Sequence, residues 1–134
     1  MDNKATTLTP ELLGLTDLAF NELITKDKPV IFAFHAYPRL VHQLTCRRTN
    51  HANTHVRGYE EEGTITTAFD MTVLNEIDCF HLVMDTIDRL PQTFEPGLHL
   101  KRCLEDRLVE HKLYIRRYGE DMPEIRHWIW GAPT

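Results

Sequence analysis

A chain of 134 residues has the size of one ordinary domain and can build a hydrophobic core without disulfide or metal cross-links. Its 15 Lys+Arg against 20 Asp+Glu give a net charge of −5, which excludes the overall basic field that nucleic-acid and anionic-membrane binding use. No apolar run approaches the ~20 residues of a membrane helix, and the polar start carries no signal-peptide core, so we expect a cytoplasmic protein.

The cysteines indicate a reducing compartment. Cys46, Cys79 and Cys103 are odd in number and form no CxxC or CxxH pair. This usage is typical of reduced thiols rather than of a disulfide framework. We expect them to be buried and inert.

The first elements in chain order are two short helices. Thr9–Glu11 predicts a helix start that Gly14 soon interrupts, and Thr16 predicts the N-cap of a second helix. Three apolar residues of the second helix share one face at 3/4 spacing, namely Phe20, Leu23 and Ile24.

The next stretch predicts an α/β fold. Val30–Phe34 is apolar without alternation, which is typical of a parallel strand covered on both faces by helices. Pro38 suits the first turn of a helix through Leu44. His55–Tyr59 alternates weakly and is a second strand, in which Gly58 marks a bulge or a close backbone approach.

The second half predicts helices. Thr67 and Asp70 resemble a capping box that begins one helix ended by Pro91. This helix carries apolar residues at 3/4 spacing, namely Val73, Leu74, Ile77, Phe80, Met84 and Ile87.

A linker over 91–97 then precedes a long helix that ends at a C′ glycine, Gly119. One face of the long helix is formed by Leu100, Cys103, Leu104, Leu108, His111 and Ile115. Residues 121–124 open a last turn, and Trp128 and Trp130 are expected to be apolar anchors.

The predicted sheet is incomplete. A buried parallel strand needs neighbours on both sides, yet the sequence offers one good strand and one weak one. Either the chain is part of a larger α/β domain, or a partner chain supplies the missing strands.

Residues 28–67 contain the candidate site, because polar groups gather just beyond the carboxyl end of the first strand, where ligands bind in open α/β sheets. An interface or anion contact is predicted from His35, Arg47, Arg48, Asn50, His51, His55, Arg57, Glu60 and Glu61. The alternatives are pairing of the arginines with residues 60–62 in the same loop, pairing with another domain, and binding of a small phosphorylated molecule.

Other chemistry finds little support. The chain has no serine, so a serine triad is excluded, and Cys46 with His51 and His55 lacks both a fourth ligand and the spacing of a metal site. His35 has no evident partner for general base catalysis. No glycine-rich phosphate cradle occurs. We therefore predict no catalytic, cofactor-binding or metal-binding residue.

Longer runs of the sequence resemble a known family. KPVIFAFHAYPRLVHQLTCRRTNHANTHVRGYEEEGTITTAFDM from Lys28, VLNEIDCFHLVMDTIDRLP from Val73 and LVEHKLYIRRYGEDMPEIRHW from Leu108 are similar to the C-terminal domain of the xylulose-5-phosphate/fructose-6-phosphate phosphoketolases. The resemblance covers 15–130, and 1–14 matches poorly. It implies an incomplete transketolase C-terminal-like α/β domain over 15–134, with few, largely parallel strands flanked by helices.

The resemblance also implies an activity for the parent enzyme. Such carbon–carbon lyases (aldehyde-lyases) use thiamine diphosphate and Mg²⁺ to split a ketose phosphate with phosphate, giving acetyl phosphate and an aldose phosphate. The cofactors are held by the preceding domains, so the resemblance implies that this chain binds none and is inactive alone. Its partners would be those domains or a second copy of itself in a homo-oligomer.

This sequence departs from the family at one turn. His35-Ala36-Tyr37-Pro38-Arg39 stands where His-Gly-Tyr-Pro-Trp is expected, Cys46 replaces an aromatic residue and Ala68 a proline. In this turn, alanine in place of glycine restricts the backbone, and arginine in place of tryptophan removes an apolar anchor. The alternative function is a stand-alone regulatory or interaction module that binds a phosphorylated metabolite through the Arg/His patch.

Overall fold

The chain divides into two compact units. A computed structural model describes residues 14–61 and 63–127, and its units are Met1–Glu60 (unit 1) and Glu61–Thr134 (unit 2). The predicted helix start at Thr9–Glu11 and the expected anchors Trp128 and Trp130 lie outside the described residues.

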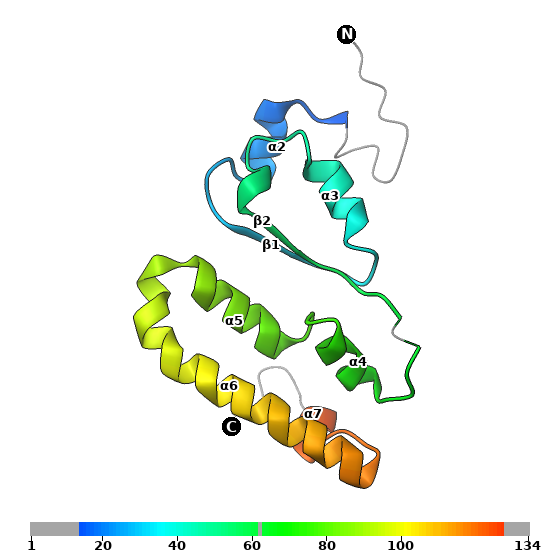
Figure 1. The fold of residues 1–134 in the computed structure, drawn as a ribbon. Helices are drawn as coiled ribbons and strands as arrows, with labels where there is room; N and C mark the ends of the chain where they lie inside the picture. The colour runs from blue at the N-terminus through cyan, green and yellow to red at the C-terminus, as the bar shows by residue number, and fades with distance from the viewer. Residues whose placement is uncertain (1–13, 62, 128–134) are drawn as a thin grey trace. The chain divides into compact units, whose positions relative to one another are not determined.

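Unit 1 alternates helices with two strands, as Figure 1 shows from blue to green. Its elements are α2 (Asp17–Leu23), β1 (Val30–Ala33), α3 (Arg39–Thr45), the 3-10 helix η1 (His51–Asn53) and β2 (Thr54–Arg57). The predicted cap is confirmed, because the Thr16 hydroxyl accepts a hydrogen bond from the Ala19 amide at 3.2 Å.

The apolar face of α2 is narrower than predicted. Phe20 is buried, but Leu23 is 63% exposed. Arg48 Cζ lies 4.4 Å from the centroid of the Phe20 ring, and Phe20 is the buried residue of α2, while Ile24 at its C-cap is half-buried.

The two strands form a parallel sheet. Val30 pairs with Thr54 and Ala33 with Arg57, and α3 lies in the crossover and contacts β2. The fold is therefore α/β, with a small two-stranded parallel sheet flanked by helices, as predicted. The expected burial of β1 on both faces is wrong for this chain, because its residues are half-buried and Ala33 is exposed.

Gly58 follows β2 and marks a close backbone approach, as predicted. A Cβ at this position would lie 2.4 Å from Pro38 Cδ and 2.6 Å from the carbonyl oxygen of Ala36. The amide of Tyr59 also donates to that carbonyl at 2.9 Å. The residues that follow β2 thus contact the turn between β1 and α3 directly.

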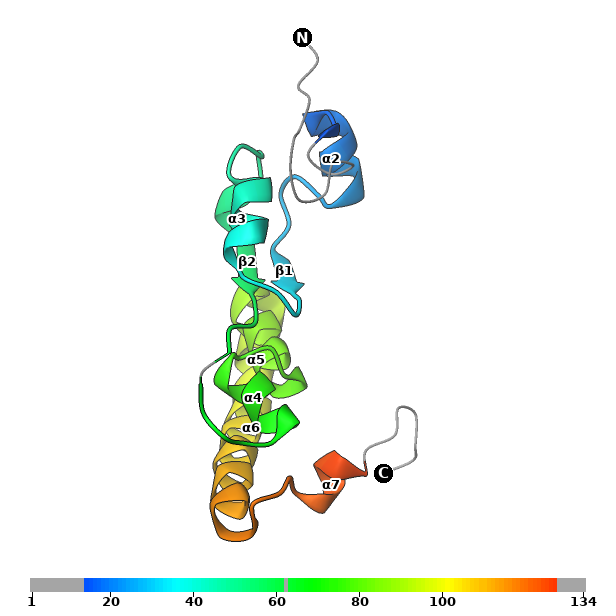
Figure 2. The same ribbon diagram turned by 90° about the vertical axis from the view of Figure 1, so that its right-hand side faces the viewer.

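Unit 2 is helical. It contains α4 (Ala68–Leu74), α5 (Cys79–Arg89), α6 (Pro91–Tyr118) and α7 (Pro123–Arg126). The helices α5 and α6 run side by side in opposite directions (Figures 1 and 2). Gly119 ends α6 with φ 73° and donates its amide to Ile115, which confirms the predicted C′ glycine.

The prediction of one helix from Thr67 to Pro91 is wrong. Asn75 ends α4, Glu76 has a positive φ of 56°, and the Asp78 carboxylate caps α5 by accepting from the Phe80 amide at 2.9 Å. The apolar residues keep their 3/4 spacing across this break, so the periodicity alone conceals it.

The predicted linker at 91–97 is also wrong, since α6 starts at Pro91 and runs through Pro96. Pro91 suits a first helical position, whereas Pro96 removes one helix hydrogen bond. At Gly97 a Cβ would lie 2.6 Å from Ile87 Cγ2, so α6 packs closely on α5 there. This packing favours helix despite the proline.

The three cysteines are free, but they are exposed and not buried as expected. Within the described residues, none of the helices has the length and apolar character needed to cross a membrane.

Candidate functional site

The predicted site begins where β1 and β2 end. The exposed His35 follows β1, and its ring stacks on Tyr59, which follows β2, with centroids 3.9 Å apart and planes 21° apart. Carboxyl ends of parallel strands meet at one sheet edge, so the sequence could place these two side chains together.

Arg48 holds α2 in place. Its guanidinium donates to Asp17 Oδ1 at 2.8 Å and to the carbonyl of Leu15 at 3.1 Å, and it covers the Phe20 ring. The side chain is only 10% exposed. Arg48 was predicted as an interface or anion contact, and the anion that it contacts within unit 1 is Asp17.

Asn50 and His51 also serve local structure. The buried Asn50 donates its side-chain amide to the carbonyl of Lys28 at 2.7 Å, which fixes the segment before β1. His51 Nδ1 lies 3.1 Å from the Thr45 hydroxyl. The Asn50 contact thus joins the segment before β1 to the segment before β2, and the His51 contact joins the end of α3 to η1.

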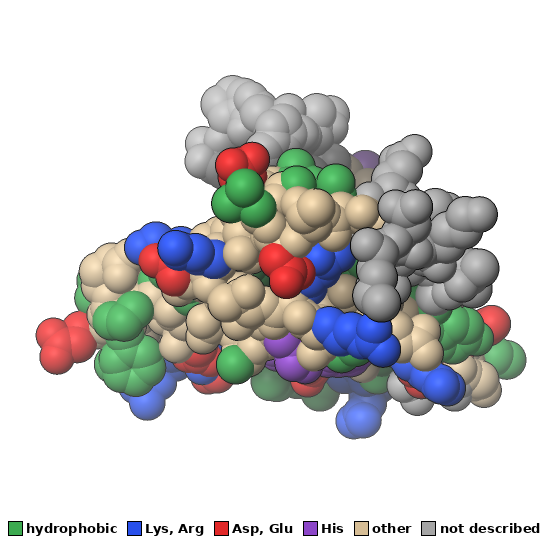
Figure 3. All heavy atoms as spheres, turned by 90° about the horizontal axis from the view of Figure 1, so that it is seen from above, with side chains coloured by type: hydrophobic (Ala, Val, Ile, Leu, Met, Phe, Trp, Pro, Cys, Tyr) green, Lys and Arg blue, Asp and Glu red, His purple; other side chains and the backbone are tan. Residues whose placement is uncertain are grey.

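The other predicted residues are dispersed. His55 and Arg57 lie in β2, paired with Ile31 and Ala33. Arg47 and Glu61 are exposed, and Glu60 is exposed at the end of unit 1. On the face drawn in Figure 3, acidic and basic side chains are interspersed with apolar and uncharged surface.

Replacing Arg48 by alanine should loosen α2, whereas replacing its neighbour Arg47 should not. Arg48→Ala removes the Asp17 ion pair and uncovers Phe20. We expect faster amide hydrogen exchange over 17–23 in Arg48→Ala and no change in Arg47→Ala, since Arg47 is exposed and forms no ion pair among the described residues. Equal effects of both variants would contradict this assignment.

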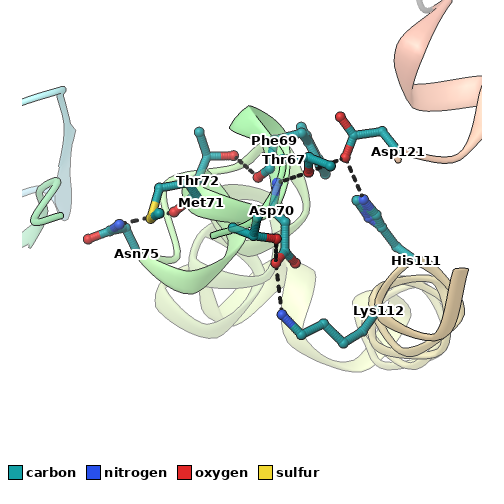
Figure 4. A network of polar contacts seen from close by, with 10 residues as sticks. Thr67, Phe69, Asp70, Met71, Thr72, Asn75, His111, Lys112 and Asp121 are labelled. Atoms are coloured by element: carbon teal, nitrogen blue, oxygen red, sulfur yellow. Dashed lines mark hydrogen bonds and ion pairs between the residues drawn. The ribbon is translucent and has the colours of Figure 1, made fainter. Parts of the chain in front are cut away.

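Unit 2 contains a second polar cluster, which we call the α4–α6 network: Thr66, Thr67, Asp70, His111, Lys112 and Asp121. Figure 4 shows five of these side chains converging from α4, α6 and the segment before α7. Thr67 caps α4 by accepting from the Asp70 amide at 3.0 Å and donates to Asp121 Oδ1 at 2.5 Å. His111 Nε2 lies 3.1 Å from the same oxygen and donates to it.

The Asp70 carboxylate is the most buried acid of the network, at 1% exposure. It accepts from Lys112 Nζ at 2.8 Å and from the Thr66 hydroxyl at 2.5 Å. Burial alone raises the pKa of Asp70, but the hydrogen bonds from Lys112 and Thr66 and the nearby positive charge outweigh it. The net pKa is below its ordinary value, so the carboxylate is ionised at neutral pH.

His111 occupies the centre of unit 2. It is 1% exposed and its ring meets the edge of Phe69 at 5.1 Å. Its Nδ1 has no hydrogen-bond partner among residues 14–61 and 63–127. The sequence placed His111 on one face of the long helix with Leu100 and Cys103; His111 is buried, but those two residues are exposed. The sequence also missed the link to Asp121, because that pairing joins residues ten apart around Gly119.

The network suits fold stabilisation better than catalysis. Its polar groups bond to one another: the Asp70 carboxylate accepts from Lys112, and the Asp121 carboxylate accepts from Thr67, the N-cap residue of α4. Cys79 is exposed as a residue, but partial burial of its thiol, followed by the charge of Asp78, raises the pKa of that thiol, which disfavours the reactive thiolate. The part of the chain that the structure describes contains no group of three or more His, Cys, Asp or Glu side chains able to hold a metal ion.

Comparison with known proteins gives one consistent result. The family described as the XFP C-terminal domain matches residues 5–130. The "Probable phosphoketolase" of Rhodopirellula baltica is 67% identical over 119 residues, and that of Nitrosospira multiformis is 62% identical over 120 residues. The "Probable phosphoketolase 1" of Rhizobium meliloti is 61% identical over 119 residues.

These matches cover about 90% of this chain and 15% of each relative, so the chain spans about one-seventh of the length of the curated relatives it matches. The residues 28–71 that carried the resemblance in the sequence form β1, α3, β2 and the start of α4 here. The chain belongs to the XFP C-terminal domain family, the C-terminal domain of phosphoketolases.

Proposed function

We propose that the chain is the C-terminal structural and interface part of a thiamine-diphosphate-dependent phosphoketolase and is inactive alone. The whole protein would cleave a ketose phosphate with phosphate to give acetyl phosphate and an aldose phosphate, as a cytoplasmic lyase of carbohydrate metabolism. The observation that carries the proposal is the small share of each relative that the chain covers, 15%.

The two-stranded sheet supports an interface role. Parallel strands are stable in sheets whose edges and faces are covered, and two strands are a marginal sheet. Here the residues of β1 and β2 are at most half-buried. Strands from the rest of a phosphoketolase, added at the edges of this sheet, would complete it.

The described residues do not suit thiamine diphosphate or Mg²⁺. Magnesium takes carboxylate and phosphate oxygens, and the described residues offer no metal-holding group. The acids of the α4–α6 network pair with lysine, histidine and threonine. We therefore assign cofactor binding to domains outside this chain.

Reassembly tests the proposal. The Rhodopirellula baltica relative, truncated before the part that matches this chain, should form little acetyl phosphate with thiamine diphosphate, Mg²⁺ and a ketose phosphate. Adding the purified chain should restore product formation, while the chain alone should give none. Acetyl phosphate from the chain alone, or full activity of the truncated relative, would contradict the proposal.

The alternative, a stand-alone module that binds a phosphorylated metabolite, is less favoured. Arg48, Asn50 and His51 belong to its candidate patch, and each side chain bonds to another residue of unit 1. Calorimetry with phosphate or acetyl phosphate distinguishes the two ideas. Heat that disappears in Arg47→Ala would favour the module.

A further inference from the structure

The long helix α6 has a second apolar face besides the one that packs in unit 2. Gly97 and His111 are buried on the packed face. Phe94 and Leu98 are 47% and 48% exposed, and Val109 and Leu113 are 60% and 59% exposed. Exposed apolar residues that gather on one face, rather than singly, are typical of interaction surfaces.

These four residues lie on one line along the helix. At 3.6 residues per turn, the positions 94, 98, 102, 105, 109 and 113 fall within an arc of about 100°. Arg102 and Glu105 fill the middle of this line. We call the six residues the α6 stripe: Phe94, Leu98, Arg102, Glu105, Val109 and Leu113.

The two charged side chains at the middle of the α6 stripe make no polar contact with the described residues. Arg102 and Glu105 are exposed, and neither forms an ion pair or a side-chain hydrogen bond with any described residue. The neighbouring cation Lys101, by contrast, is bonded to Asp88 of α5 at 2.7 Å. The stripe therefore has one cation and one anion without an ion-pair partner among the described residues, and they lie between the apolar pairs Phe94/Leu98 and Val109/Leu113.

The spacing of the stripe residues along the helix is the same when read from either end. Its members are separated by four, four, three, four and four residues, and the centre lies between Cys103 and Leu104. An identical helix laid antiparallel on this centre brings Phe94 level with the second copy's Leu113. It also brings Leu98 level with Val109 of that copy, and Arg102 level with Glu105.

We propose that the α6 stripe is a two-fold interface with a second copy of this chain. A two-fold antiparallel pair repeats each contact twice, so the interface gains two Arg102–Glu105 ion pairs between apolar layers. A parallel pair would instead place Arg102 against Arg102 and Glu105 against Glu105. The charges thus select the antiparallel arrangement.

The surface of the stripe is suitable for docking. A hollow of about 570 Å³ is lined by Phe94, Leu98, Lys101, Arg102 and Glu105, with His99 at its side. In the antiparallel arrangement, Val109 and Leu113 of the second copy lie level with Leu98 and Phe94 at this hollow. The inference concerns pairing of the chain and does not depend on the reaction proposed above.

Sedimentation of the purified 134-residue chain tests the interface. A stripe of this size gives a weak dimer, so the wild type is measured up to on the order of 100 μM. We expect a dimer whose dissociation constant rises about tenfold or more in Arg102→Glu and in Glu105→Arg, because each variant opposes like charges. The double variant R102E/E105R restores opposite charges and should restore the dimer.

Mixing the two single variants gives a sharper result. Arg102→Glu has two acids at the centre and Glu105→Arg has two bases, so the mixed pair forms both ion pairs. We expect the mixture to dimerise while each variant alone stays mostly monomeric. Circular dichroism spectra like that of the wild type would show that the variants fold.

Leu98→Asp and Leu100→Asp form a matched pair of controls. Leu98 is 48% and Leu100 47% exposed, but Leu100 lies about 160° away around the helix. We expect only Leu98→Asp to prevent dimerisation. A monomeric wild type, a dimer insensitive to these substitutions, or equal effects of both aspartates would overturn the proposal.

Discussion

Replacing Gly58 by alanine is expected to destabilise unit 1, unlike the same replacement at Gly14. The new Cβ would lie 2.4 Å from Pro38 Cδ and 2.6 Å from the carbonyl oxygen of Ala36, closer than real Cβ contacts. The carbonyl of Ala36 is backbone and accepts from the Tyr59 amide, so moving it strains that hydrogen bond, and the Pro38 ring has no rotamer that would take it out of the way. We expect a loss of about 1–3 kcal/mol or more in the free energy of unfolding.

Hydrogen exchange of the β1 and β2 amides measures this effect within unit 1. Each 1–2 kcal/mol lost should speed exchange by about 5- to 30-fold. Gly14→Ala is the matched control, since a Cβ there has nothing within 4 Å. Unchanged exchange in Gly58→Ala would show that the strand ends have more room than the structure gives them.

Replacing Asp70 by alanine is expected to have a comparable effect on unit 2. It removes the acceptor of Lys112 and Thr66, and it leaves the half-buried Thr66 hydroxyl without that bond. Because Lys112 is 41% exposed and therefore partly screened by water, we expect about 2 kcal/mol rather than the cost of breaking a fully buried pair. Asp106→Ala is the control, because Asp106 is an exposed acid of α6 with no ion pair among the described residues.

The same carboxylate predicts a pH dependence. A carboxyl whose pKa is lower in the folded state than the ordinary 3.8 stabilises the fold fully above that value. This contribution is lost as the pH falls through the lowered pKa of Asp70. The free energy of unfolding of unit 2 in urea can be measured from the exchange of the α4 amides. It should fall on acidification below about pH 4 in the wild type, and fall less in Asp70→Ala. An equal acid loss in both proteins would contradict this role.

Sequence reasoning succeeded where the signal is local. Thr16 and Thr67 were predicted as caps and Gly119 as a C′ residue, because each bonds an amide or carbonyl within four residues. Val30–Phe34 was predicted as a strand from its apolar composition, and β1 covers Val30–Ala33. Family membership was predicted from long runs of residues, and it is confirmed.

Sequence reasoning failed where distant contacts decide. Asp70 and Lys112 are 42 residues apart and Thr67 and Asp121 are 54 apart, so no local pattern joins them. The break at 75–78 was visible only as the capping residue Asp78 within a continuous apolar period. Gly97 looked like part of a linker, and its contact with Ile87 makes it part of a helix pair.

The turn between β2 and α4 has a practical consequence. Glu60, Glu61, Gly63, Thr64 and Ile65 are all exposed, and Gly63 has a positive φ of 63°. Extra residues in an exposed turn add little loop-closure entropy, since its cost grows slowly with length. An affinity tag or fluorescent label inserted after Gly63 therefore offers a way to follow this chain inside a larger assembly while leaving the hydrogen bonds of both units intact.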